Sequence, residues 1–107
     1  MEPITIYRPI QRVDASNASA AEQDVQNLFE QGAQSLLIDL SDVTYLSSAG
    51  LRVLLIAAKT AKARGGKIAL ASVKPTVKDI ITMSGFDKLM AICVDREAGL
   101  AHLQSSN

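Results

Sequence analysis

Residues 36–55 read LLIDLSDVTYLSSAGLRVLL, and this stretch decides the fold. Its first part, 36–40, is apolar at every position except Asp39, which predicts a strand buried on both faces, as in a parallel sheet. A polar turn follows at 41–44. Ser-Ser-Ala-Gly at 47–50 then opens an apolar pattern with helical spacing. The stretch therefore predicts a strand, a turn and a helix whose first turn lies at the protein surface.

The rest of the chain alternates between predicted strands and helices. Apolar spacing and Gly or Pro punctuation define these elements. In chain order they are a strand over 4–7, a loop over 11–17, a helix over 18–31, the strand over 36–40, a helix over 48–64, a strand over 67–73, a helix from Pro75, a strand over 88–94, and a helix capped by Asp95 and ending at Leu103. This order predicts an α/β domain with a mostly parallel sheet of four or five strands and about four helices.

The helix over 48–64 has a wide predicted apolar face. Four residues form one stripe and two more widen it: Leu51, Leu54, Leu55 and Ala58, then Val53 and Ile56. A face of this width predicts deep packing against the sheet.

The length and composition predict one domain over residues 1–107. Of the 107 residues, 48% are hydrophobic and 21% are charged, which suffices for a folded core. Lys+Arg and Asp+Glu each number 11, so no basic surface for nucleic acid is expected. Neither a leader pattern nor a bilayer-length apolar run occurs, which predicts a cytoplasmic protein without membrane insertion. The oligomeric state stays open.

Residues suited to catalysis or metal binding are scarce. Cys93, the only cysteine, lies in an apolar run and is expected to be a buried structural thiol. His102, the only histidine, has no catalytic neighbour, and the serines at 47–48 lack the preceding glycine of a nucleophile elbow. No phosphate-binding glycine loop or metal-ligand cluster occurs. We therefore expect no enzymatic activity, no metal and no cofactor.

Ser47 and Ser48, at the predicted helix start, have two interpretations. A serine here commonly caps exposed backbone N–H groups. Alternatively, a phosphate on a first-turn serine lies beside the positive end of the helix dipole and adds a charge of about −1.5 to −2. A partner that buries this surface would have to desolvate a dianion, so phosphorylation would break the complex without unfolding the protein.

Asp39 and Asp42 suggest a different chemistry. Carboxylates at the C-terminal end of a parallel strand can hold Mg²⁺ or accept a phosphoryl group. A phosphoaspartate receiver using Asp39 needs a further acidic cluster, for which only Asp14 is available after the first strand. The simpler interpretation is that Asp42 orders the turn and Asp39 ends the strand.

Several motifs together resemble a known family. Residues 38–52, IDLSDVTYLSSAGLR, resemble the signature of the STAS domain, the fold of bacterial anti-sigma factor antagonists. Residues 11–15 are similar to the family's Gly-Arg-Leu-Asp-Ala segment, with Gln11 in place of the glycine, and residues 65–68 and 77–86 fit in order. The resemblance covers about 4–103 and implies a STAS-like sheet, here with four strands where many members have five.

The resemblance also implies a function. In typical antagonists an anti-sigma factor with serine kinase activity phosphorylates a serine two positions before a glycine, and a serine phosphatase resets the protein. The unphosphorylated antagonist binds the anti-sigma factor and frees the sigma factor. The matching residue here is Ser48, with Ser47 as the fallback site. This chain departs from the motif at two positions, because Ser47 replaces the family's aspartate and Ala49 replaces its second serine.

The expected partner surface is the turn at 41–47 and the first turns of the following helix. It comprises Ser41, Asp42, Thr44, Tyr45, Ser47, Ala49, Gly50 and Arg52. We expect Arg52 to pair with an acidic group of the partner or to be a solvated charge, and Gly50 to allow close approach of a partner or to serve packing. A second hypothesis is a constitutive STAS subunit of a signalling complex or a lipid-transport ATPase, without phosphorylation. The receiver hypothesis for Asp39 is the third.

Overall fold

The computed structural model describes residues 4–9 and 11–105. Its elements, in chain order, are β1 (Ile4–Tyr7), β2 (Arg12–Val13), α1 (Ala18–Glu30), β3 (Ser35–Asp39), β4 (Tyr45–Leu46), α2 (Ser48–Ala63), β5 (Ile68–Ala71), α3 (Pro75–Met83), the 3-10 helix η1 (Phe86–Lys88), β6 (Ala91–Cys93) and α4 (Arg96–Gln104). The expectation that the sequence carries no leader segment concerns residues 1–3, among others, and these three lie outside the described residues.

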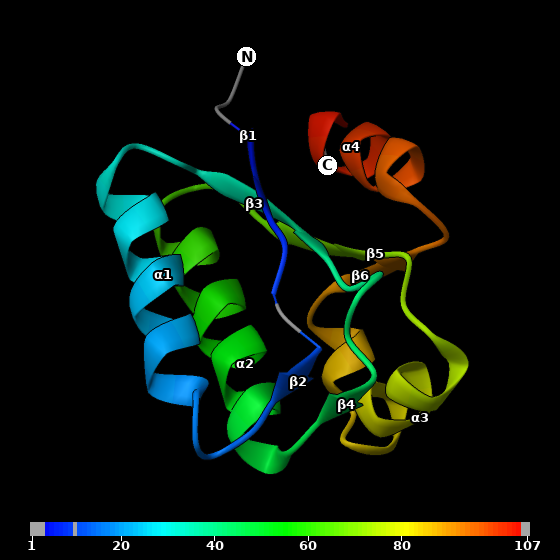
Figure 1. The fold of residues 1–107 in the computed structure, drawn as a ribbon. Helices are drawn as coiled ribbons and strands as arrows, with labels where there is room; N and C mark the ends of the chain where they lie inside the picture. The colour runs from blue at the N-terminus through cyan, green and yellow to red at the C-terminus, as the bar shows by residue number, and fades with distance from the viewer. Residues whose placement is uncertain (1–3, 10, 106–107) are drawn as a thin grey trace.

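The main sheet is parallel and has the strand order β1-β3-β5-β6 (Figure 1). This confirms the predicted α/β fold with a four-stranded sheet and four α-helices. Strand β3 is buried at all five positions because it lies between β1 and β5, as its consecutive apolar residues indicated. Strand β1 lies at the edge of the sheet and covers the predicted range 4–7. It ends two residues before Pro9, which has no N–H to donate to a strand ladder.

A second, two-stranded sheet was not predicted. Strands β2 and β4 pair in parallel, with Arg12 opposite Tyr45 and Val13 opposite Leu46. Backbone hydrogen bonds extend the pairing, from the Thr44 N–H to the Gln11 carbonyl at 2.8 Å and from the Ser47 N–H to the Val13 carbonyl at 3.0 Å. The expected loop over 11–17 therefore contains a strand. Two-residue strands are too short to show an alternating pattern, which is why the sequence did not reveal them.

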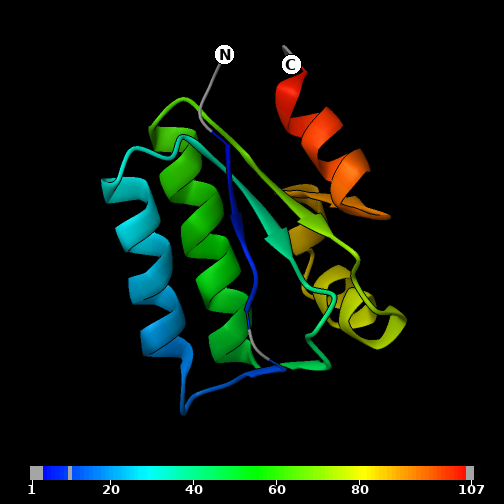
Figure 2. The same cartoon turned by 45° about the horizontal axis from the view of Figure 1, so that its top comes forward.

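The prediction of which α2 residues face the core is partly wrong. Its fully buried residues are Gly50, Val53, Leu54, Ala57 and Ala61. Of the predicted stripe only Leu54 and the widening residue Val53 are among them, and the remaining four residues are half-buried. The small residues of this face let α2 approach α1 and the sheet closely, so the helix is rotated relative to the prediction. Both helices lie side by side on one face of the sheet (Figure 2).

The last strand is shorter than predicted. Residues 86–88 form η1, and β6 covers only three residues. The side chains of Leu89 and Val94 are exposed rather than part of a strand. The Asp95 cap is confirmed, since its carboxylate accepts the Ala98 N–H at 2.9 Å and begins α4, which packs on the opposite face of the sheet. Within the described residues, none of the helices combines the length and apolar character that crossing a membrane requires.

Candidate functional site

The turn between β3 and β4 is held from three directions. The Asp39 carboxylate accepts the Ser41 N–H at 2.9 Å. Arg8, beyond the end of β1, donates to both carboxylate oxygens of Asp42 at 2.8 and 3.0 Å. The Lys74 ammonium, just before α3, donates to the Ser41 carbonyl. Three separate elements therefore fix the loop that leads into α2.

The two serines at the start of α2 have different environments. Ser47 is the N-cap, where its hydroxyl oxygen accepts the Gly50 N–H at 3.3 Å and its O–H donates to the Val13 carbonyl at 3.4 Å. Ser48 is the first residue of the helix and is exposed. Its hydroxyl makes no hydrogen bond to any other described residue. The capping role thus falls to Ser47, and the hydroxyl of Ser48 is accessible.

Gly50 serves internal packing. It is buried, and a Cβ atom at this position would lie 2.5 Å from the Val13 carbonyl oxygen and 3.2 Å from Leu46 Cδ2. Only a glycine lets β2 and β4 lie this close to the first turn of α2. Of the two roles expected for Gly50, close approach of a partner or packing, this geometry favours packing, because the backbone next to Gly50 is the protein's own.

A shallow groove runs between the first turns of α1 and α2. It has a volume of about 520 Å³ and is lined by Ala15, Ala18, Ser19 and Glu22 on one side and by Ser48, Ala49 and Arg52 on the other. Arg52 is exposed and lies one helical turn after Ser48, so both side chains reach the same groove. Three of the predicted site residues therefore lie together.

Tyr45 lies on the neighbouring β2–β4 sheet and is 39% exposed. The guanidinium carbon of Arg12 lies 4.6 Å from the centre of its ring, a cation–π contact. Thr44, also exposed, donates its hydroxyl to the Gln11 carbonyl at 3.3 Å. Arg12 is not recognisable as a site residue from the sequence, because only the unpredicted β2–β4 pairing places it beside Tyr45.

Asp39 is a structural anchor. Its residue is 3% exposed, and its carboxylate accepts the Arg96 Nε–H at 2.6 Å as well as the Ser41 N–H. Burial acts to raise the pKa of this carboxyl, but the hydrogen bonds from Ser41 and Arg96 outweigh it, so the pKa lies below its usual value. Among the described residues, no three His, Cys, Asp or Glu side chains are grouped to hold a metal ion. The burial of Asp39 and its bonds to Ser41 and Arg96 disfavour a phosphoryl acceptor at this carboxylate.

Cys93, in the edge strand β6, is half-buried rather than fully buried. Burial raises the pKa of its thiol, and the nearby charge of Asp95 adds to the effect. A thiol with a raised pKa is weakly nucleophilic, which agrees with a structural role.

The fold of the described residues, with its four-stranded parallel sheet and four α-helices, is STAS-like. The crystal structure of a Thermotoga maritima protein designated an anti-sigma factor antagonist matches with a TM-score of 0.87 and 22% identity, over 94% of this chain and 86% of that one. Unphosphorylated SpoIIAA, also titled an anti-sigma factor antagonist, matches with a TM-score of 0.80 and 17% identity, over 100% of this chain and 94% of its own. These likenesses concern the fold.

Sequence comparison gives the family. The STAS domain model matches residues 1–99. BtrV of Bordetella bronchiseptica, designated an anti-sigma factor antagonist, is 32% identical over 94 residues, which cover 88% of this chain and 81% of BtrV. The chain belongs to the STAS domain family. Its relatives of the anti-sigma factor antagonist type are non-enzymatic binding regulators, and the chain is a protein of that kind.

Proposed function

We propose that this protein is a partner-switching anti-sigma factor antagonist of the cytoplasm that regulates transcription. Unphosphorylated, it binds an anti-sigma factor with serine kinase activity; phosphorylated on Ser48, it is released, and a serine phosphatase resets it. The observation that carries this proposal is the exposed, unbonded hydroxyl of Ser48 on the first turn of a helix that Ser47 already caps. The designation of BtrV supports the partner, and SpoIIAA, known in a phosphorylated form, supports the modification.

The local electrostatics suit a phosphate on Ser48. The first turn of α2 contains no acidic residue. Glu22 is the acidic side chain across the groove, and the cation Arg52 on the same side as Ser48 offsets its charge. The positive end of the helix dipole stabilises the added phosphate, and the fold is therefore expected to persist. A partner that covers the groove would instead have to desolvate a dianion, which costs several kcal/mol. The modification thus weakens the complex and spares the domain.

Arg52 gives the switch a second component. Its guanidinium has no partner among the described residues and lies one turn after Ser48. In the unphosphorylated protein it is available to an acidic group of the anti-sigma factor. After phosphorylation, the Arg52 guanidinium instead binds the Ser48 phosphate on the same helix, because side chains four residues apart are neighbours on a helix surface. The remaining contact surface is formed by Thr44, Tyr45 and Ala49, with Ser41, Asp42 and Ser47 as supports of the loop.

The test is a phosphorylation assay with each anti-sigma factor kinase encoded in the same genome. The protein, Ser48→Ala and Ser47→Ala are incubated with kinase and ATP, and intact mass and peptide mapping locate the phosphate. We expect one phosphate on the wild type and on Ser47→Ala, and none on Ser48→Ala. Gel filtration should show a complex with the kinase that Ser48→Glu weakens by about tenfold or more. Phosphate retained in Ser48→Ala, or a complex indifferent to Ser48→Glu, would contradict the proposal.

A constitutive subunit of a larger assembly is the second candidate. The observation favouring it is that position 47 holds a capping serine, not the aspartate typical of the family, so no carboxylate adjoins the Ser48 hydroxyl in the sequence. This candidate predicts an unmodified protein under growth and stress conditions. It also predicts a stable complex that survives both Ser48→Ala and Ser48→Glu.

A further inference from the structure

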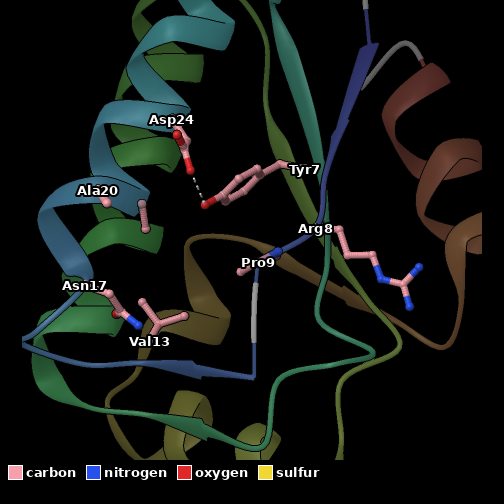
Figure 3. Close-up of a pocket in the computed structure, with 8 residues that line it drawn as sticks. Tyr7, Arg8, Pro9, Val13, Asn17, Ala20 and Asp24 are labelled. Atoms are coloured by element: carbon pink, nitrogen blue, oxygen red, sulfur yellow. Dashed lines mark hydrogen bonds between the residues drawn. The ribbon is translucent and has the colours of Figure 1, made fainter.

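A pocket of about 130 Å³ lies between the end of β1, strand β2 and the first half of α1 (Figure 3). Its walls are mainly apolar, formed by Tyr7, Pro9, Val13, Ala20 and Ala21. The pocket exists because positions 20 and 21 of α1 carry only methyl groups where longer side chains would reach the sheet. A dry engineered cavity of about 150 Å³ holds one benzene molecule, so this pocket has room for a group of that size.

The opening of the pocket is acidic. The Tyr7 O–H points toward α1 and donates to Asp24 Oδ2 at 3.4 Å, as Figure 3 shows. That distance exceeds the usual O–H···O length of about 2.8 Å, so the exposed carboxylate of Asp24 can accept a stronger donor. Burial, followed by the charge of Asp24, raises the pKa of Tyr7 to about 12.

The other polar groups of the lining are already paired. The Asn17 amide oxygen accepts the Asp14 N–H at 3.0 Å, and its NH₂ donates to the Arg12 carbonyl at 2.7 Å. The guanidinium of Arg8 turns away from the pocket and binds Asp42 (Figure 3). Asp24 therefore sets the charge at the opening, and the complementary ligand is a cation with an apolar body.

The inner wall of the pocket connects it to the candidate functional site. Val13 lines the pocket, and its carbonyl accepts both the N–H and the O–H of Ser47. A small apolar void of about 10 Å³ continues inward from Val13 to Leu46 and Gly50. A ligand in the pocket would thus contact the residue that fixes the first turn of α2.

We propose that this pocket binds a small organic amine, an aryl or alkyl group bearing an ammonium, with its apolar body against Val13 and the alanines and its ammonium on Asp24. Binding reinforces the contact of β2 with the start of α2. The site is separate from Ser48, so the proposal holds or fails independently of phosphorylation.

The experiment is an amide NMR titration of the full chain with benzylamine, and with benzyl alcohol and benzoate as neutral and anionic counterparts. We expect saturable shifts at Tyr7, Val13 and Ser47, with benzylamine binding about tenfold more tightly than benzyl alcohol and benzoate more weakly still. Ala20→Leu fills the pocket from an exposed helix position and should abolish the shifts. Gln23→Leu, at an exposed position of α1 outside the pocket lining, should preserve them.

Asp24→Asn separates the two parts of the proposal. It should lower the affinity for benzylamine to that for benzyl alcohol and leave benzyl alcohol unchanged. Linear, non-saturating shifts, or shifts that persist in Ala20→Leu, would overturn the pocket as a binding site. Equal affinities for benzylamine and benzoate, or an unchanged benzylamine affinity in Asp24→Asn, would overturn the amine as its ligand.

Discussion

The two faces of the main sheet are covered in different ways (Figure 2). One face packs against α1, α2 and α3 in a large apolar cluster that also includes Val13 and Leu46 of the small sheet. The other face is covered by α4, in a cluster built on Leu37, Ala69, Ala71 and Leu103. The candidate site belongs to the first face. Its geometry therefore depends on backbone packed between several elements, whereas α4 depends on few side chains and one ion pair.

The sharpest test of this difference compares two glycines. In Gly50→Ala the new Cβ would meet the Val13 carbonyl at 2.5 Å, and in Gly99→Ala it would meet Leu37 Cδ1 at 2.4 Å. A backbone carbonyl held by the small sheet cannot yield, whereas a leucine methyl can rotate. We expect Gly50→Ala to lose about 3 kcal/mol in urea unfolding, and Gly99→Ala to lose about 1 kcal/mol or less because the helix gains an alanine. Equal losses would contradict the distinction between the faces.

The Asp39 carboxylate binds both Ser41, in the loop that leads to α2, and Arg96 of α4. Its replacement should therefore cause the next largest loss of stability. Asp39→Asn keeps an acceptor for the Ser41 N–H but loses the ion pair with Arg96, which is half-exposed, so we expect a loss of about 2 kcal/mol at pH 7. Asp87→Asn, at an exposed aspartate of η1, is the matched control.

The pH dependence of stability tests whether the ionised Asp39 carboxylate is responsible for this loss. The pKa of Asp39 is lower in the folded protein than in the unfolded chain, so its stabilisation is present above the unfolded pKa of about 4 and is lost as pH falls through the folded value. The stability of the wild type should therefore fall more steeply below about pH 4 than that of Asp39→Asn. Parallel curves for the two proteins would exclude this role of the carboxylate.

The adjacent serines provide a smaller contrast within the first face. Ser47→Ala removes the N-cap of α2 and should cost about 1 kcal/mol. Ser48→Ala removes an exposed hydroxyl and should change the free energy of unfolding by less than about 0.5 kcal/mol. Denaturant unfolding of both variants measures the difference. A larger loss for Ser48→Ala would mean that its hydroxyl has a structural partner.

The smallest effect concerns Tyr7, between β1 and α1. Tyr45→Phe leaves Tyr7 as the only tyrosine, and ultraviolet absorbance should then report its ionisation at about pH 12. Because this pKa lies above the unfolded value of about 10, the stabilisation is complete below pH 10 and is lost as pH rises through the folded value. Asp24→Asn should lower the midpoint only in part, since burial is the larger cause. An ordinary midpoint near 10 would show that the phenol is solvated.

The sequence predicted the elements that carry a strong local signal. Consecutive apolar residues identified β3, and the glycines after three helices have the left-handed backbone expected there, with φ of 111° at Gly32, 83° at Gly65 and 82° at Gly85. The β2–β4 sheet has no such signal, because each strand is two residues long and forms only against the other. Without that sheet, neither the burial of Gly50 nor the position of Arg12 follows from the sequence.

The sequence and the structure contribute different parts of the candidate site. The motif selected Ser48, but the structure was needed to assign the cap to Ser47 and leave Ser48 unbonded. The pocket beside Tyr7 was not predicted at all. The pocket results from the small side chains of Ala20 and Ala21. Their effect on packing can be recognised only once the position of α1 against β1 is known.

The small sheet joins segments that are distant in the chain, as in the Thr44–Gln11 hydrogen bond, whose residues are 33 positions apart. A kinase that recognises the surface around Ser48 therefore reads a shape that no short peptide of this sequence reproduces. If Ser48 is phosphorylated as proposed, chains that have not folded lack that surface and would escape modification. Under the proposed function, the phosphorylated fraction would then include only folded molecules.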